Sequence, residues 1–296
     1  MTGFLDEVGR RLAERWVALL AVPGLLYVAA VTVTVALGQQ HAVDVSALGR
    51  RITAWAGGAA LRSPGGAILF AVAVLAGSVG AGLTASVLGR AAERAWFAVG
   101  RRWPGRLLTG WRQARAREAK RVADDPASSR ALAGRAMERA DRICLVEPAR
   151  PTWIGDRLRV TEVRAELAYG LDLAAAWPRL WLMVPDGVRG EIGTAGESLA
   201  AAAQLAGWAV LYAVLGLWWW PAAPIALITA ITCAIRARAA AGVLADLVES
   251  AVDLHSRQLA VQLGAPVTGQ LTPAEGAKLT TLMRKSRWDP ASPTAQ

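Results

Sequence analysis

The side chains best suited to chemistry are four polar residues near the C-terminus. Asp246, Glu249 and Asp253 are spaced so that a helix would carry all three on one face, with His255 close by. Carboxylates and histidine are common metal ligands. The chain supplies no further ligand at a recognisable spacing. We therefore interpret this face as solvated or salt-bridged, with arginines of the middle region as partners.

A second polar group lies in that middle region. Residues 156–166 alternate in charge sign along a helical pattern, which is typical of surface ion pairs; a functional pocket is the alternative. The candidate functional cluster that we take from both groups consists of Asp156, Arg157, Tyr169, Asp172, Arg179, Asp253 and His255. The sequence contains no nucleophile elbow, phosphate-binding loop, HExxH or paired CxxC motif. It therefore predicts no catalytic residue, no metal site and no cofactor.

Long uncharged stretches must position these residues. Residues 17–38, 63–89 and 198–235 contain no charged side chain, and eighteen or more such apolar residues are typical of a membrane span. As one helix, the last stretch would be about 57 Å long, roughly twice the hydrocarbon thickness of a bilayer. It must hold two spans, with the break at residues 218–224. The sequence thus predicts an all-α integral membrane protein with four transmembrane helices in two hairpins.

The expected organisation of the chain follows from these spans. It comprises an amphipathic N-terminal segment at 1–16, a first hairpin at 17–89, a cytoplasmic region at 90–197, a second hairpin at 198–238, a cytoplasmic helical extension at 239–285 and a disordered tail at 286–296. Residues 45–56, between the first two spans, are predicted to form an interfacial helix. The cytoplasmic region is expected to be mainly helical.

Capping signals mark two helices in the polar regions. Thr152 is expected to cap a helix over 153–168, and Gly170 to end it. Thr272 and Glu275 have the spacing of a capping box, which predicts a short helix to about residue 283. The apolar segment 173–184 is too short to span a membrane, so we expect it to be a buried or interfacial part of the soluble region.

Small residues recur every four positions in the second span. Ala73, Gly77 and Ala81 form one row, and Ser78 and Gly82 belong to another. Small side chains at this spacing let two helix backbones approach closely in a membrane. We expect Gly77, Ser78, Ala81 and Gly82 to pack against another helix, either within the chain or across a homo-oligomer.

The distribution of charge predicts the topology. The net charge is +10, and residues 90–121 hold ten Lys and Arg against two Glu. Positive residues flank membrane spans on the cytoplasmic side, which accounts for the charge more simply than a nucleic-acid partner does. Both termini and residues 90–197 are therefore expected in the cytoplasm. The predicted spans hold no ionisable group, which weighs against coupled transport and intramembrane catalysis.

The helix after the last span carries an apolar stripe. Its members recur at three and four positions: Leu244, Leu247, Val248, Ala251 and Leu254. The segment lies beyond Arg236 and Arg238, which mark the cytoplasmic end of the last span. Lipid therefore cannot cover the whole stripe. We expect this helix to dock on the cytoplasmic region around residues 171–184.

Two patterns resemble a family of uncharacterised bacterial multi-span membrane proteins. They are PTWIGD at 151–156 with YGLD at 169–172 and WPRL at 177–180, and LVESAVDLHSRQLAVQLG at 247–264. The resemblance implies four spans, an intervening cytoplasmic region and no established activity. The Ala-, Arg- and Gly-rich composition suggests a high-GC bacterium such as an actinobacterium.

These observations lead us to expect a membrane-anchored interaction or regulatory protein of the bacterial inner membrane, without catalysis. Its expected partners are the lipid bilayer, a second copy of itself and a cytoplasmic protein. The alternative is a pore or channel-like effector gated by its cytoplasmic region. A lipid-modifying enzyme that uses residues 156–172 is a third interpretation, but it lacks a motif.

Overall fold

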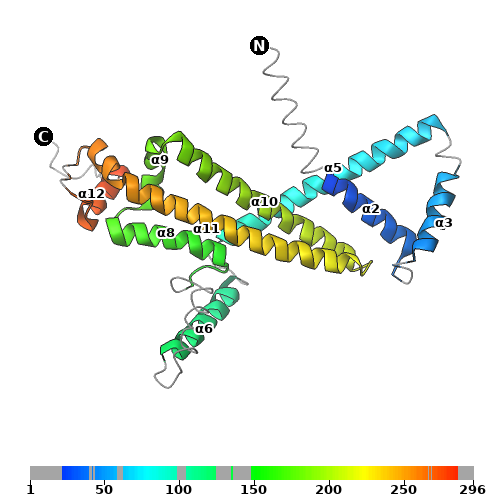
Figure 1. The fold of residues 1–296 in the computed structure, drawn as a ribbon, viewed down its shortest axis with the longest axis horizontal. Coiled ribbons are helices and arrows are strands. Elements are labelled where there is room, and N and C mark those ends of the chain that lie inside the picture. The colour runs from blue at the N-terminus through cyan, green and yellow to red at the C-terminus, as the bar shows by residue number, and fades with distance from the viewer. Residues whose placement is uncertain are drawn as a thin grey trace, which may run out of the picture. The chain divides into compact units, whose positions relative to one another are not determined.

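The computed structural model describes residues 22–39, 42, 44–58, 63–98, 105–124, 135, 148–265, 267 and 269–285. Every regular element in these ranges is a helix (Figure 1), which confirms the predicted all-α class. The expected amphipathic segment at 1–16 and the tail at 286–296 lie outside the described residues.

The chain divides into two compact units. Unit 1 comprises Met1–Glu93 and Ala200–Ile235, and unit 2 comprises Arg94–Leu199 and Arg236–Gln296. Unit 1 contains α2 (Val22–Leu37) and α3 (Val45–Ala56), and unit 2 contains α6 (Gly105–Asp124), α8 (Trp153–Tyr169), α9 (Leu173–Met183) and α12 (Pro273–Met283). Three longer helices supply residues to both units: α5 (Pro64–Phe97), α10 (Asp186–Gly216) and α11 (Ala222–Gln262).

Among the described helices, α5, α10 and α11 are long and apolar enough to cross a membrane. The uncharged stretch 198–235 is divided between α10 and α11, as its length required. Helix α2 has 16 described residues and extends about 24 Å, which is short of a hydrocarbon core. The predicted first span also includes residues 17–21, which lie outside the described residues.

Close backbone contacts hold unit 1 together. A Cβ on Gly24 of α2 would overlap the carbonyl of Ser78 in α5, and a Cβ on Gly207 of α10 would overlap the carbonyl of Ala85. The ring of Tyr27 adds an edge contact to Tyr212 with centroids 5.4 Å apart. Glycine is therefore required where these helices meet.

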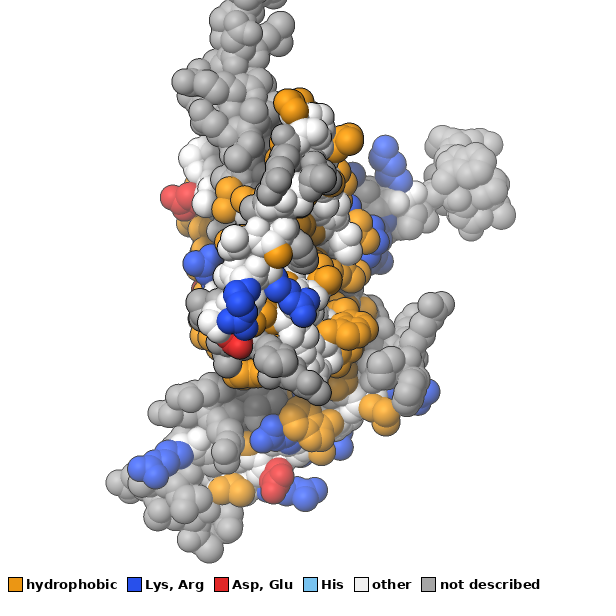
Figure 2. All heavy atoms as spheres, turned by 90° about the vertical axis from the view of Figure 1, so that its right-hand side faces the viewer, with side chains coloured by type: hydrophobic (Ala, Val, Ile, Leu, Met, Phe, Trp, Pro, Cys, Tyr) orange, Lys and Arg blue, Asp and Glu red, His pale blue; other side chains and the backbone are white. Residues whose placement is uncertain are grey.

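The outer surfaces of the long helices are apolar. Only 11% of the most apolar stretch of α5 is buried within the protein, and 22% of that of α11. Leu69 is 72% exposed and Ile228 is 65% exposed. Figure 2 shows hydrophobic side chains at the surface on the face that it draws. Lipid is the medium that covers such surfaces without cost.

Unit 2 has a small hydrophobic core between α8, α9, α11 and α12 (Figure 1). Leu171 and Leu180 are fully buried there, together with Val252 of α11. The predicted caps are confirmed: the Thr152 hydroxyl accepts the Gly155 N–H, Gly170 adopts the left-handed conformation with φ 65°, and Thr272 forms the capping box. Helix α8 therefore begins and ends at its predicted capping residues, and α12 begins at its predicted capping box.

Helix α11 docks on α8 and α9 as expected, but not through the whole predicted stripe. Leu254 is 73% exposed, so its assignment to the buried face is wrong. The face that is buried carries Ala241, Ala245 and Val252, followed by Ser256, Leu259 and Ala260. Hydropathy ranks leucine above alanine, whereas a close contact between helices favours small side chains.

Candidate functional site

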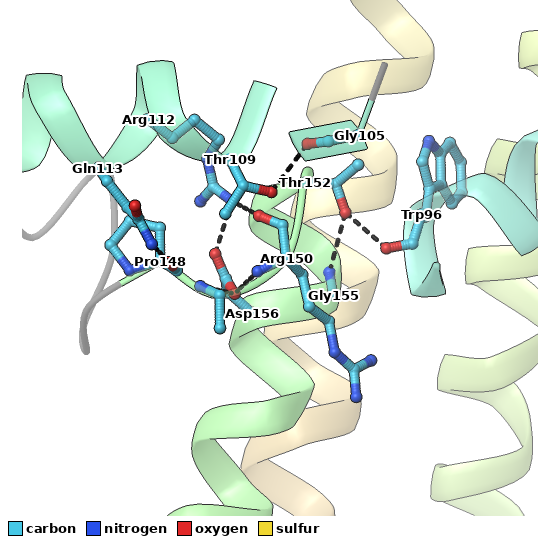
Figure 3. A network of polar contacts seen from close by, with 11 residues as sticks. Trp96, Gly105, Thr109, Arg112, Gln113, Pro148, Arg150, Thr152, Gly155 and Asp156 are labelled. Atoms are coloured by element: carbon cyan, nitrogen blue, oxygen red, sulfur yellow. Dashed lines mark hydrogen bonds and ion pairs between the residues drawn. The ribbon is translucent and has the colours of Figure 1, made fainter. Parts of the chain in front are cut away.

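The carboxylate of Asp156 is the centre of a buried polar network in unit 2 (Figure 3). Arg112 of α6 donates to one of its oxygens at 2.5 Å. The backbone N–H groups of Ala149 and Arg150 donate to the other, at 3.1 and 2.8 Å. The side chain of Asp156 is 7% exposed and that of Arg112 is 11% exposed. Every one of these donors belongs to the protein, so the carboxylate serves to join α6 to the start of α8.

Neighbouring contacts strengthen the same junction. The hydroxyl of Thr152 donates to the Trp96 carbonyl at 2.6 Å, and the side chain of Gln113 donates to the Pro148 carbonyl at 2.7 Å (Figure 3). A Cβ on residue 155 would lie 2.5 Å from the Trp96 oxygen. Gly155 therefore allows the end of α5 to approach the first turn of α8.

The acidic face of α11 pairs with α8. Arg157 forms an ion pair with Asp246, and Arg164 pairs with Glu249 at 2.9 Å. Further along, the Tyr169 hydroxyl donates to Asp253 at 2.9 Å. Residue numbers rise together on both helices, so α8 and α11 run parallel. The salt-bridged interpretation is confirmed for Asp246 and Glu249.

The contact between α8 and α11 also raises the pKa of the Tyr169 hydroxyl. Burial, the hydrogen bond to Asp253 and the negative charges of Asp253 and Glu249 all raise the pKa of Tyr169 above its usual 10.0. The phenol therefore stays protonated at neutral pH and acts as a hydrogen-bond donor. This is what the α8–α11 contact requires of it.

Asp172 joins α9 to the C-terminal helix. Its carboxylate caps α9 through the Ala174 N–H and accepts from the Nε of Arg284 at 2.9 Å. Burial acts to raise the pKa of Asp172, but the ion pair with Arg284 and the amide donors outweigh it, so the pKa lies below 3.8. Arg179 completes the contact by donating to the carbonyl of Met283 at 3.1 Å.

The seven candidate residues therefore do not converge on one site. All but His255 belong to three separate helix contacts. Asp156 joins α6 to α8; Arg157, Tyr169 and Asp253 lie between α8 and α11; and Asp172 and Arg179 join α9 to the end of α12. His255 faces Gln258, with Nδ1 and Oε1 2.9 Å apart. No group of three or more possible metal ligands occurs in the described part of the chain.

The small residues of α5 divide into two faces. Ser78 and Gly82 are buried in unit 1, and Ser78 lies where Gly24 crosses. Gly77 is exposed, and a Cβ there would meet only Val28, at 3.4 Å. Ala81 is half-buried. The row of Ser78 and Gly82 is thus used within the chain, whereas Gly77, in the other row, remains at the surface.

Unit 2 contains a groove that the sequence did not reveal, with a volume of about 840 Å³. Its lining comes from α5, the 148–152 turn, and helices α8 to α11. We call it the tryptophan groove, because Trp177 and Trp181 lie along it. The pattern WPRL marked these residues as unusual, but no spacing could show that helices so far apart in sequence meet around them.

Comparisons with protein-family models, with curated proteins and with solved structures find no match to this chain.

Proposed function

We propose that this chain is a membrane-anchored interaction or regulatory protein of a bacterial cytoplasmic membrane, with unit 2 as its interaction part and without a catalytic role. One contrast within unit 2 supports this. Its charged candidate residues pair with one another and join helices, whereas the tryptophan groove is an open apolar surface with few polar groups. Binding sites are commonly of this kind, while a catalytic site needs polar groups that converge on the cavity.

The proposed membrane arrangement has four spans, formed by the regions of α2, α5, α10 and α11 as two hairpins. Both termini and unit 2 are then cytoplasmic. The ten basic residues in 90–121 support this orientation through the positive-inside rule. The resemblance of the chain to uncharacterised bacterial multi-span proteins supports the same span count.

Self-association is a further part of the proposal. The exposed position of Gly77 on an apolar helix supports a contact with a second copy. Gly77→Leu is expected to shift the purified protein to a smaller species in light scattering, whereas Gly193→Leu, at an open position of α10, should not. The same mass for both variants would contradict this part.

A photo-crosslinking experiment tests the assignment of unit 2. Benzoylphenylalanine replaces Trp181 in the groove or, as control, Leu182, which is 77% exposed and outside the groove lining. We expect ultraviolet light in cells to produce adducts at position 181 and few at 182. Equal yields at both positions would show that the groove is not a preferred binding surface.

Reconstitution separates the proposal from the pore alternative. The full-length protein in planar bilayers should give no more current than a protein-free bilayer under a 100 mV potential. Reproducible single-channel steps would contradict the proposal and favour a pore.

A further inference from the structure

The wall of the tryptophan groove is apolar, and four of its helices contribute leucine or isoleucine side chains. Leu158, Leu173, Ile192 and Leu244 belong to α8, α9, α10 and α11. Leu158, Leu173 and Leu244 are half-buried, so each still presents surface to the groove. A volume of about 840 Å³ falls within the range of pockets that hold small molecules. An apolar chain is the chemistry that such a wall accommodates best.

Two indole rings stand at this wall. The centroids of Trp177 and Trp181 are 5.8 Å apart, and their planes are tilted by 48°. Both residues are half-buried, so ring surface is accessible. Tilted aromatic faces attract cations, and ammonium groups are their characteristic ligands. The pair therefore favours a ligand with a positively charged end.

The groove also has one charge of each sign. Arg150 and Glu162 form a long ion pair, with 3.9 Å between the charged atoms, and their side chains are 19% and 54% exposed. In Figure 3 the guanidinium of Arg150 extends away from the Asp156 carboxylate, which uses only the backbone N–H of Arg150. The guanidinium donates a long hydrogen bond to the Phe97 carbonyl, at 3.5 Å. One cation beside one anion is complementary to a zwitterion rather than to a singly charged ligand.

A buried threonine hydroxyl lies beside the groove. Thr161 lines it and is 1% exposed. Within the described residues, its Oγ1 has no hydrogen-bond partner. Buried hydroxyls normally have one, from protein or from another molecule. The Thr161 Oγ1 has almost no accessible surface, so this hydroxyl does not itself face the groove.

The groove is close in sequence to the uncharged stretches. Phe97, Ile192 and Leu244 line it, and each lies fewer than ten residues from the end of one of those stretches. Ten helical residues extend about 15 Å. Membrane lipid is therefore the most abundant amphiphile within reach of these segments.

We infer that the tryptophan groove binds a zwitterionic phospholipid. The headgroup ammonium lies against Trp177 and Trp181 and pairs with Glu162. The phosphate pairs with Arg150, and acyl chain follows the wall formed by Leu158 and its neighbours. This inference rests on the proposed function and names the ligand class of the same surface.

Native mass spectrometry of the delipidated full-length protein tests the inference. Three probes share dioleoyl chains: phosphatidylethanolamine, anionic phosphatidylglycerol and headgroup-free dioleoylglycerol. We expect phosphatidylethanolamine to bind about tenfold more tightly than either of the others. Glu162→Gln should reduce its affinity to that of phosphatidylglycerol, because the ammonium loses its carboxylate partner while the apolar wall is unchanged.

Matched variants keep the result interpretable. Glu166→Gln makes the same change one turn along α8, outside the groove lining, and should leave all three affinities unchanged. Glu162 is 54% exposed, so its variant is expected to fold, and an unchanged melting temperature verifies this. Trp177→Leu should weaken phosphatidylethanolamine alone.

Three outcomes would overturn the inference. The first is equal affinity for all three lipids, as expected of non-selective annular lipid. The second is a higher affinity for phosphatidylglycerol than for phosphatidylethanolamine. The third is an unchanged phosphatidylethanolamine affinity in Glu162→Gln. None of these depends on the current measured in planar bilayers. Failure of lipid selectivity is therefore distinguishable from failure of the proposed function.

Discussion

Units 1 and 2 are stabilised by different forces. Unit 1 brings uncharged helices together at glycine, with Gly24 against Ser78 and Gly207 against Ala85. Unit 2 joins its helices with ion pairs and caps around a small leucine-rich core. Lipid offers helices no hydrophobic drive to associate, so close packing must serve there. In the proposed arrangement unit 2 lies in water, which provides that drive and tolerates charge at the margins of the core.

The small hydroxyl side chains of unit 1 bond mainly within their own helix, although Gln204 of α10 also donates to Ser86 of α5 at 3.1 Å. In unit 1 the hydroxyls of Ser78 and Thr84 donate to carbonyls of their own helix at 2.8 Å. Thr229 and Thr232 do the same in α11, so these two hydroxyls are satisfied within the helix. In unit 2 several ion pairs instead join different helices: Arg112 with Asp156, Arg157 with Asp246, and Arg164 with Glu249.

The largest expected effect is in the core of unit 2. Val252→Asp places a carboxylate at a position that is 1% exposed, which should destabilise unit 2 by roughly 3–5 kcal/mol. Leu254→Asp makes a similar change two residues on, where the side chain is 73% exposed, and should cost less than about 0.5 kcal/mol. Limited proteolysis of unit 2 measures both. Similar resistance of the two variants would mean that α11 is not docked.

Breaking the Asp156 network is expected to destabilise unit 2 almost as much as Val252→Asp does. Asp156→Ala leaves the buried guanidinium of Arg112 without its carboxylate, which should cost about 3–5 kcal/mol. Asp186→Ala removes an exposed ion pair with Arg189, whose partners are 94% and 35% exposed, and should cost 0 to about 1 kcal/mol. Urea unfolding in detergent compares them. An equal loss in both would refute the structural role of the network.

A medium effect is expected where α10 meets α5 in unit 1. Gly207→Ala forces its Cβ against the Ala85 carbonyl, and overpacking of this kind costs about 1–3 kcal/mol. Gly193→Ala lies on the same helix in open space and should stabilise it by up to about 1 kcal/mol. The melting temperatures should move in opposite directions. A shift of the same sign in both variants would exclude the close contact.

The smallest expected effect is the loss of stability of the α9–α12 contact at low pH. The folded-state pKa of Asp172 lies below its usual 3.8, so its pair with Arg284 stabilises the α9–α12 contact above that pH. The contribution is lost as the pH falls through the lower folded value. It should stay below about 1 kcal/mol, because Arg284 is 60% exposed. Hydrogen exchange of α12 at pH 3 and 6 should depend on pH more in wild type than in Asp172→Asn; identical dependence would contradict this.

Signals confined to a few adjacent residues could be read from the sequence. Thr152, Gly170 and Thr272 act on the backbone beside them, so the ends of their helices were predictable. The length of the uncharged stretch at 198–235 likewise required two helices. These rules need no knowledge of which other helix lies nearby.

The contacts between distant segments could not be read in this way. Arg112 is the partner of Asp156, yet nothing in their spacing distinguishes it from the many other arginines. Ala241 and Ala245 form the buried face of α11 although their neighbours are more hydrophobic. The tryptophan groove requires the packing of several helices at once. A single sequence carries periodicity but not the identity of partners.

The proposed topology places unit 1 in the membrane and unit 2 in the cytoplasm. Labelling of intact protoplasts with a membrane-impermeant maleimide tests it, in a Cys144→Ala, Cys233→Ala background. Ser46→Cys, in the connection between the first two predicted spans, should be labelled from outside. Leu167→Cys, at a side chain that is 75% exposed in unit 2, should react only after lysis. Labelling of Leu167→Cys in intact protoplasts would contradict the account.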